Sequence, residues 1–228
     1  MQTIGIVGGL GTETSCSFCF NVNSKIKNSH QVQPHLIMDN IPMPDDMFHK
    51  IANGEPQEFI LNLLKDSVLR LNKVDSDLIV IPCNTVHVFI EELRNVSKTP
   101  ILSIIEETAK KCVESSFKRV GILGSTTTTK SELYQKELRK QSINTICLNE
   151  GNQKIVTHII IKIIGLKSNN KDKEKLLQII QDMKNQGAEA VILGCTDLFL
   201  LVKDEESVLP IIDSTSVLEE AVINKLTN

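Results

Sequence analysis

The sequence predicts an α/β fold made of two similar halves, each containing a parallel sheet. Two separate phrases, each typical of a strand that runs into a turn and a helix, occur twice. The phrases are TIGIVGGLGTETS (3–15) with RVGILGSTTTTKS (119–131), and DLIVIPCNTVH (77–87) with AEAVILGCTDL (188–198). Gly5 recurs at Gly121 and Cys83 at Cys195, so both features repeat after nearly half of the 228 residues, which indicates a duplicated unit. The alternative to duplication is that two unrelated segments use the same strand-turn-helix arrangement. This alternative explains the glycine-rich turns better than it explains why a Cys-Thr or Cys-Asn-Thr sequence follows a strand in both halves.

A ligand site is predicted where the strand 78–81 ends. Its residues are uniformly apolar and too few for a typical helix, which indicates a buried strand of a parallel sheet. The residues that follow directly are Pro82, Cys83, Asn84 and Thr85. Open α/β sheets bind their ligands at the carboxyl ends of the strands. Cys195 and Thr196 follow the corresponding strand of the second half, so a thiol is expected at both strand ends.

The composition indicates a cytoplasmic protein that acts on a small molecule. A hydrophobic content of 41% in 228 residues suffices for one large or two small α/β domains. The 25 basic and 28 acidic residues are well mixed, so no nucleic-acid surface is expected. The chain enters a strand without a signal-peptide pattern, and no apolar run reaches membrane-spanning length. Six irregularly spaced cysteines fit a reduced compartment better than a disulfide framework.

The first half is predicted to begin with strand 3–8 and a glycine-rich turn into a helix near Glu13. The glycines of this turn lack the spacing of the dinucleotide-binding fingerprint, so a nucleotide site is not expected. Cys16 and Cys19 lie one helical turn apart with no second cysteine pair nearby. We interpret them as buried helix cysteines rather than as redox or metal-binding residues.

The rest of the first half is predicted as strand 34–39, a loop and two helices. Residues 40–56 are rich in proline and polar residues, and a loop of this length is typical of an active-site lid. Apolar spacing predicts a helix over 56–72. A further helix is predicted over 86–96, with its amino end beside Cys83, where free backbone N–H groups favour an anion or a thiolate.

The second half is predicted to contain a helix to about residue 116 and a strand over 119–123. Further helices are expected at 130–141, 153–164, 171–186 and 214–226, and the last of these is expected to pack back on the first half. The hydroxyl-rich stretch from Ser125 to Thr129 follows the strand. Helix capping and ligand contact explain this stretch equally well, because it lies at the same sheet edge as the thiols.

Two thiols that face each other across a cleft are suited to inversion at a carbon centre. One group removes a proton from one face of the carbon, and the other delivers a proton to the opposite face. An unperturbed thiol has a pKa of about 8.5, so modest stabilisation supplies one thiolate near neutral pH while its partner stays protonated. Asn84, Thr85 and Thr196 are suited to hold a carboxylate. A packing role is the usual alternative for a single cysteine, but the matched contexts of Cys83 and Cys195 argue against it.

Several residues are left outside this reaction. His87 is at least as often a structural hydrogen-bonding residue in such a position as a catalytic one. We interpret Cys112 and Cys147 as packing residues and give the single Tyr134 little functional weight. No His, Cys and carboxylate cluster shows the spacing of metal ligands, so no metal site is expected.

Three motifs carry a family resemblance: IGIVGGLG (4–11), PCNTVH (82–87) and GCTDL (194–198). They resemble those of the aspartate/glutamate racemase family, closest to its aspartate racemase branch. The similarity extends over nearly the whole chain, through EETAKK (106–111), KSELYQ (130–135) and GAEAVILGCT (187–196). It implies two pseudo-two-fold related Rossmann-like domains with the active site in the cleft between them. It also implies cofactor-independent racemisation of an amino acid, often by a homodimer.

The resemblance also implies residue roles and domain boundaries. The implied catalytic thiols are Cys83 and Cys195, the implied substrate contacts are Asn84, Thr85, Thr128 and Thr196, and Lys167 matches a basic residue near the site. The first domain is expected to comprise residues 1–101 and about 212–228, and the second about 102–211.

One departure from the family pattern concerns the substrate. Aspartate racemases commonly carry Pro-Asp-Arg after the second strand, where this chain has Pro44, Asp45 and Asp46. An arginine there would pair with the side-chain carboxylate of the substrate, whereas Asp46 would repel it. Aspartate is the expected substrate. Glutamate, another amino acid, or His49 or Lys50 in the place of the arginine stay open, as do a related isomerase or decarboxylase of carboxylic acids and an amino-acid-binding protein without catalysis.

Overall fold

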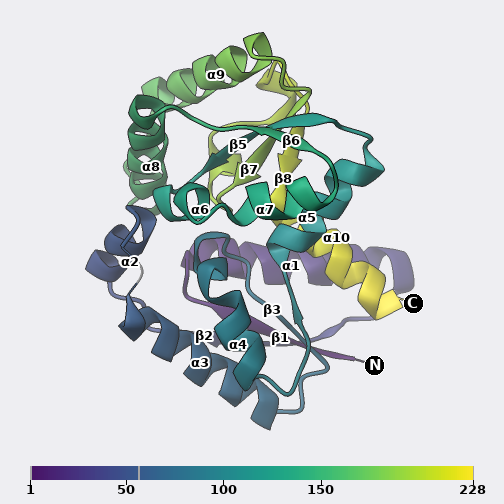
Figure 1. Cartoon of the computed structure of the whole chain (residues 1–228). Helices are drawn as coiled ribbons and strands as arrows, with labels where there is room; N and C mark the ends of the chain where they lie inside the picture. The colour runs from purple at the N-terminus through teal and green to yellow at the C-terminus, as the bar shows by residue number, and fades with distance from the viewer. Residues whose placement is uncertain (1, 56, 228) are drawn as a thin grey trace.

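The fold consists of two four-stranded parallel sheets in which the second, first, third and fourth strands of each half lie side by side (Figure 1). The computed structural model describes residues 2–55 and 57–227, with the backbone alone for Thr12, His30 and Asp45. The strands of the first sheet are β2 (His35–Asn40), β1 (Thr3–Gly8), β3 (Leu78–Val80) and β4 (Ile101–Leu102). Those of the second are β6 (Asn144–Ile146), β5 (Arg119–Gly124), β7 (Ala190–Gly194) and β8 (Ile211–Asp213). The predicted α/β fold with two similar halves is confirmed.

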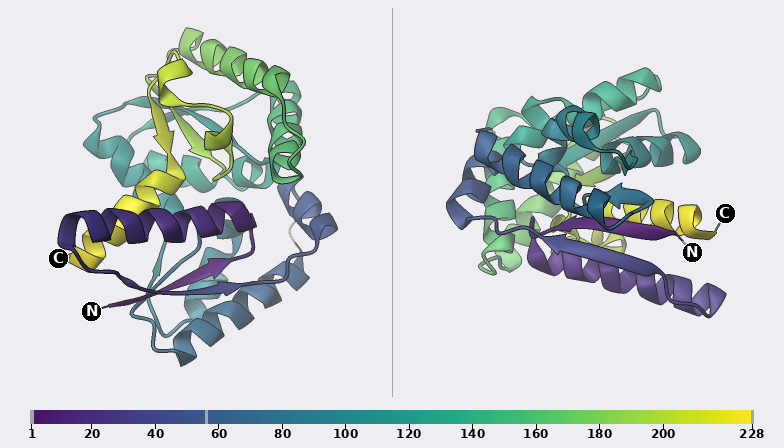
Figure 2. Two further views of the ribbon diagram at one scale, coloured as in Figure 1. Left: turned by 180° about the vertical axis from the view of Figure 1, so that it is seen from behind. Right: turned by 90° about the horizontal axis from the view of Figure 1, so that it is seen from below.

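Helices cover both faces of each sheet. The first half contributes α1 (Thr12–His30), α2 (Asp45–Ala52), α3 (Glu58–Lys73) and α4 (Ile90–Val96). The later helices are α5 (Ile104–Glu114), α6 (Thr126–Lys130), α7 (Leu133–Lys140), α8 (Glu150–Ile164), α9 (Asn170–Asn185) and α10 (Ser214–Thr227). Helix α10 returns to lie beside α1, as predicted (Figure 2). Within residues 2–55 and 57–227, no helix has both the length and the apolar character needed to span a bilayer.

The two halves share one apolar core. Ile4 of β1 and Phe18 of α1 belong to the same buried cluster as Ile122 of β5, together with residues of α5, α7 and α10. Because successive strand residues point to opposite faces, Val7 of β1 lies in a second cluster with α3, and Leu123 of β5 in a third with α8 and α9. The shared cluster holds the two sheets together. The expected domain boundaries near residues 101 and 212 stay a prediction.

The stretch 40–56 is not the loop that the sequence predicted, because it contains helix α2. Pro44 has an extended backbone and precedes the first helical residue. Phe48, Ile51 and Ala52 are buried, so the helix has an apolar face despite its polar flanks. Helix α2 packs against α6 and α8 of the second half.

Two predicted helices differ in their starts. The helix predicted over 86–96 begins as a 3-10 turn, Thr85–Phe89, and becomes α4 only afterwards. The helix predicted over 130–141 consists of α6 and α7, which are separated by Glu132 in a left-handed conformation with φ of 54°. The β-branched threonines before Lys130 disfavour a helix by themselves, but the capping side chain of Ser125, which accepts from the Thr128 N–H, starts α6 among them.

Two cysteines expected in packing roles are exposed. Cys16 lies on the face of α1 opposite to the buried Phe18 and Val22, because residues two positions apart in a helix point in different directions. Cys19 is half-buried, with its Sγ 3.8 Å from Met38 Sδ. Cys147 is also exposed, whereas Cys112 is buried as predicted.

The turn after β1 requires glycine at position 9. Gly9 has a φ of 83°, and a Cβ there would lie 2.1 Å from the backbone oxygen of Ile41. We expect Gly9→Ala to lower the free energy of unfolding by more than about 2 kcal/mol, because it adds a strained backbone conformation to a clash with the main chain. Urea denaturation measures this change.

Gly151→Ala is the matched control, since a Cβ in the first turn of α8 would meet only Asn149 Oδ1 at 3.4 Å. We expect this variant to keep or gain stability, by up to about 1 kcal/mol. Equal stability of the Gly9→Ala variant and the unmodified protein would contradict the packing of this turn on residue 41.

Candidate active site

The two predicted catalytic thiols follow β3 and β7, and both are almost fully buried. The exposed fraction is 5% for Cys83 and 6% for Cys195. The Cys83 N–H donates to the Ile81 oxygen over 2.8 Å, so the chain turns immediately after the strand. Burial is the main cause that raises the pKa of Cys195, and negative charge on Cys83 adds a smaller increase, so the two sulfur atoms lie within electrostatic reach of each other.

Burial keeps both thiols protonated in the ligand-free protein. It raises the pKa of Cys83 to about 12, although the backbone N–H of Val86 acts in the opposite direction. Burial also raises the pKa of Cys195 well above the ordinary value, and the nearby negative charge of Asp197 adds to the effect. Backbone N–H groups after Cys83 therefore lower the pKa of its thiol, as predicted, but desolvation raises this pKa by more.

Asp197 joins the second thiol to the first half. Its Oδ2 lies 3.9 Å from Cys195 Sγ, and its Oδ1 accepts a hydrogen bond from the Thr14 hydroxyl of α1. Gly11 has a φ of 112°, and a Cβ there would lie 3.5 Å from both carboxylate oxygens, so the glycine-rich turn lies directly against this carboxylate. Burial raises the pKa of Asp197. Asp197 is not among the site residues predicted from the sequence, although it stands in the GCTDL motif next to Thr196.

A chain of buried hydroxyl groups crosses between the halves beside Cys83. Thr85 Oγ1 lies 3.0 Å from Ser125 Oγ, which in turn lies 3.0 Å from Thr128 Oγ1. The Thr128 N–H also donates to Ser125 Oγ over 3.2 Å, which is the cap of α6. Capping is therefore the role of Ser125. The Ser125 hydroxyl also links Thr85 to Thr128, since it lies within hydrogen-bond distance of both hydroxyl groups.

Asn84 is held by the second half through its side-chain amide. Its Nδ2 donates to Ser214 Oγ over 3.0 Å, and its Oδ1 accepts from the hydroxyl of Tyr134. Ser214 in turn donates to the Leu193 oxygen over 2.7 Å. The side-chain oxygen of Asn84 is thus engaged inside the protein, and one Nδ2 hydrogen has no partner among the described residues. Tyr134, which was expected to carry little functional weight, fixes this side chain.

The remaining predicted contacts are placed differently. Thr196 is buried beside Cys195, and its hydroxyl has no hydrogen-bond partner among the side chains and backbone that the structure describes. Lys167 is exposed after α8, where its backbone N–H donates to the Lys162 oxygen over 2.8 Å. Lys167 is not part of the cluster around the thiols. Ile164, three residues earlier, lines a pocket that reaches Asp197.

This pocket has a volume of about 230 Å³ and opens between the halves. Its lining residues are Gly9, Gly11, Glu13, Met43, Phe48, Ile164 and Asp197. Both ionisable side chains among them are acidic. Asp46 of α2 is exposed and pairs with Lys50 over 3.3 Å. The lining therefore offers apolar and negative surface, and none of these residues is a cation.

His87 has a structural role. Its Nδ1 donates to the Cys83 oxygen over 2.8 Å, and its Nε2 accepts from the Ile104 N–H over 3.3 Å. These two partners require the neutral ring, and burial lowers the pKa of His87 to about 4. The imidazole thus ties the turn after β3 to the start of α5 and holds no proton for the reaction.

The fold is that of the two-domain racemases. A putative Asp/Glu racemase from Yersinia pestis aligns with a TM-score of 0.86 and 21% identity over 100% of both chains. An aspartate racemase from Picrophilus torridus aligns with a TM-score of 0.83 and 26% identity, over 99% of this chain and 94% of that one. A glutamate racemase from Francisella tularensis, solved with D-glutamate, aligns with a TM-score of 0.68 and 16% identity over 99% and 81%.

Sequence similarity identifies the family. The model of the Asp/Glu/hydantoin racemase family matches residues 7–222. The chain is also 28% identical, over 226 residues, to the broad-specificity amino-acid racemase RacX of Bacillus subtilis. This alignment covers 97% of this chain and 96% of that protein. The chain belongs to the Asp/Glu/hydantoin racemase family. The expectation of an isomerase of the amino-acid racemase type is confirmed.

The buried neutral His87 makes stability depend on pH. Because its folded pKa of about 4 lies below the ordinary 6.5, the unfolded chain binds more protons between these values. The contribution of His87 is fully present above pH 6.5 and is lost as the pH falls towards 4, by about 3 kcal/mol in total.

Urea denaturation of the unmodified protein and of the His87→Gln variant between pH 4 and 7 measures this contribution. The variant is expected to show a shallower fall, and the comparison cancels Asp197, whose raised pKa acts with the opposite sign. Parallel stability curves for the two proteins would contradict a neutral buried His87.

Proposed function

We propose that this racemase interconverts the L- and D-forms of an amino acid without a cofactor, with Cys83 and Cys195 on opposite faces of the α-carbon. The observation that carries the proposal is the pair of thiols at equivalent strand ends, each buried and each within electrostatic reach of the other. Family membership supports the reaction type.

In the proposed reaction one cysteine acts as a thiolate and removes the α-proton. The other cysteine, still protonated, delivers its proton to the opposite face, so the product differs from the substrate only in configuration. Both thiols are protonated before the substrate binds, because burial raises the pKa of each. The ammonium group of a bound amino acid stabilises a neighbouring thiolate, so we propose that one thiol releases its proton to the solvent as the substrate binds.

The substrate carboxylate is proposed to bind beside the first thiol. Thr85 and Thr128, joined through Ser125, supply hydroxyl groups there, and the free hydrogen on Asn84 Nδ2 supplies a fixed donor. Thr196 has a hydroxyl without a partner among the described residues next to the second thiol. Lys167 lies outside this cluster, and we propose for it a contact at the cleft entrance beyond Ile164.

Two substrate classes have support. The resemblance to aspartate racemases makes aspartate the first candidate, and the solved aspartate racemase from Picrophilus torridus agrees with it. The pocket beside Asp197 favours a second candidate, an amino acid without an acidic side chain, because its ionisable lining residues, Glu13 and Asp197, are both carboxylic acids. The broad-specificity relative supports this second candidate.

We also propose a cytoplasmic homodimer, as the family resemblance implies. The mixed charge and irregular cysteine spacing support the compartment. Sedimentation equilibrium of the purified protein tests the oligomeric state.

Replacement of either Cys83 or Cys195 by alanine is expected to lower the rate of racemisation at least about 100-fold, because each variant lacks one of the two proton-transferring groups. Chiral chromatography of the products measures the rate. Cys112→Ala is the matched control, since Cys112 is equally buried but packs in the shared core, and this variant should keep the activity. Full racemisation without one of the two proposed thiols would exclude the two-base mechanism.

A panel of amino acids incubated with the protein in D₂O ranks the two substrate classes. Proton NMR follows the loss of the α-proton signal from aspartate, glutamate, alanine, methionine and lysine. If Asp46 repels an acidic side chain, Asp46→Arg should raise exchange of aspartate about tenfold or more. Asp46→Asn is the control, because it removes the repulsion without adding a cation. Faster exchange of aspartate than of alanine, methionine and lysine by the unmodified protein would exclude the second class.

A further inference from the structure

Helix α1 carries a Cys-x-x-Cys pair that the proposed racemisation does not use. Cys16 and Cys19 lie one turn apart on the same side of the helix, because residues three positions apart in a helix are neighbours. Both are free thiols, Cys16 exposed and Cys19 half-buried. Packing against the core does not account for a thiol at the surface beside another thiol.

A third sulfur atom lies next to this pair. It belongs to Met38 of the edge strand β2, whose Sδ is 3.8 Å from Cys19 Sγ. Gly8 of β1 makes room for the methionine, since a Cβ at that position would lie 2.9 Å from Met38 Sδ. The side chain of Met38 is 36% exposed. The thioether therefore packs on the sheet and still reaches the surface, on the face along which α1 runs (Figure 2).

The spacing of these sulfur atoms suits a shared metal ion. A metal–thiolate bond is about 2.3 Å long, so two sulfur ligands of a trigonal or tetrahedral site lie about 4 Å apart. The separation of Cys19 Sγ from Met38 Sδ is close to this value. Two helix residues at positions i and i+3 have Cβ atoms about 5–6 Å apart, which lets both cysteine sulfur atoms reach one ion.

The electrostatics of the pair favour a bound cation. Burial raises the pKa of Cys19, and negative charge on Cys16 adds a smaller increase to this pKa. Two thiolates at this place therefore repel each other. A cation between them removes the repulsion, and each thiol releases its proton to the solvent as it binds the ion.

We propose that Cys16, Cys19 and Met38, the three-sulfur cluster, form a binding site for the soft monovalent ion Cu(I) between α1 and β2. Thiolate and thioether ligands favour Cu(I), whereas Zn²⁺ is bound by cysteine, histidine and carboxylate side chains. The complex contains one Cu(I), two thiolates and one thioether, and the copper keeps its oxidation state. The spacing of His, Cys and carboxylate residues does not predict this site, because the third ligand is a methionine 19 positions after Cys19.

The three-sulfur cluster is separate from the reaction cleft. Cys16 follows Thr14 by two residues, so its sulfur points away from the helix face that binds Asp197. None of the three residues lines the pocket beside Asp197. The proposal therefore does not rest on the proposed function.

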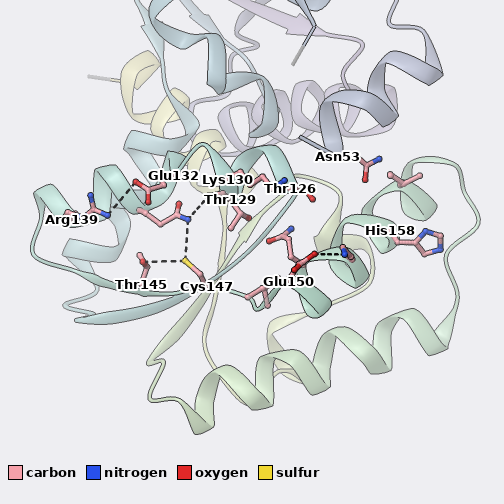
Figure 3. Close-up of a pocket in the computed structure, with 15 residues that line it drawn as sticks. Asn53, Thr126, Thr129, Lys130, Glu132, Arg139, Thr145, Cys147, Glu150 and His158 are labelled. Carbon is pink, nitrogen blue, oxygen red and sulfur yellow. Dashed lines mark hydrogen bonds and ion pairs between the residues drawn. The ribbon is translucent and has the colours of Figure 1, made fainter. Parts of the chain in front are cut away.

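Cys147 is also exposed but has different neighbours, which makes it the matched control. Its Sγ accepts from Gln135 Nε2 over 3.5 Å and lies 4.0 Å from Thr145 Oγ1. Figure 3 shows this thiol and Thr145 in the pocket that both residues line. These neighbours offer nitrogen and oxygen, which suit Cu(I) less well than sulfur does.

Competition with the chelator bicinchoninate under nitrogen measures Cu(I) binding without reference to catalysis. We expect the reduced protein to bind one Cu(I) at the three-sulfur cluster with a Kd of about 1 nM or tighter. Mn²⁺, which prefers oxygen ligands, is the metal control and should not bind there. The Cys83→Ala/Cys195→Ala protein should bind the same Cu(I), because its surface sulfur atoms are unchanged.

Single variants locate the ion. Cys16→Ser and Cys19→Ser should each weaken Cu(I) binding at least about 100-fold, and Met38→Leu about tenfold, because a thioether is the weaker ligand. Cys147→Ser should leave the affinity unchanged. X-ray absorption should show three sulfur neighbours of copper in the unmodified protein and two in Met38→Leu. An unchanged melting temperature without metal checks that each variant folds.

Two results would overturn the site: full Cu(I) affinity in both the Cys16→Ser and Cys19→Ser variants, and loss of the ion from the Cys83→Ala/Cys195→Ala protein. A Cys16–Cys19 disulfide that persists in reductant would also overturn it, because those sulfur atoms no longer bind a cation. An inactive racemase would count against the proposed function alone, since copper uptake does not depend on turnover.

Discussion

The geometry around the thiols depends on buried polar bonds that cross from one half of the molecule to the other. Thr14 binds Asp197, Thr85 binds Ser125, and Asn84 binds both Tyr134 and Ser214. Each bond joins a residue near one strand end to a residue of the opposite half. An apolar contact holds two surfaces together without fixing their relative angle, whereas hydrogen bonds with a narrow range of length and direction fix it. The shared core holds the two halves together, and these hydrogen bonds fix their relative orientation.

Burial has opposite effects on structure and chemistry at this site. It fixes the thiols, because close packing restricts each side chain to one position. It also raises the pKa of each thiol and so disfavours the thiolate that would do the chemistry. Protonated thiols react slowly with electrophiles, and in the proposed reaction one of them becomes reactive only when the ammonium group of the substrate enters. The same desolvation that makes the resting thiol inert makes an ammonium group effective, because charges interact strongly where water is excluded.

The features that the sequence predicted well are those that depend on neighbouring residues. The strands at 3–8 and 119–124, and the position of a cysteine after β3 and after β7, follow from short apolar runs and the residues next to them. Helix α2 was missed because its apolar face is recognised only against α6 and α8, which are distant in the chain. The hydrogen bond of Tyr134 to Asn84 joins residues 50 positions apart, and that of Thr14 to Asp197 joins residues 183 positions apart. No local sequence pattern predicts bonds between residues so distant in the chain. Ser125 illustrates the intermediate case, since its capping role is local and its bond to Thr85 is not.

The return of α10 to α1 has a consequence for biosynthesis. The core that packs α1 against β1 also contains Val217, Leu218 and Val222 of α10, which are synthesised long after α1. The first half therefore emerges with part of its apolar surface uncovered, and this surface stays uncovered until α10 has been synthesised. Independent folding of the first hundred residues is unfavourable for the same reason. In the interval, the uncovered apolar face of α1 is a surface on which the nascent chain can aggregate or bind a chaperone.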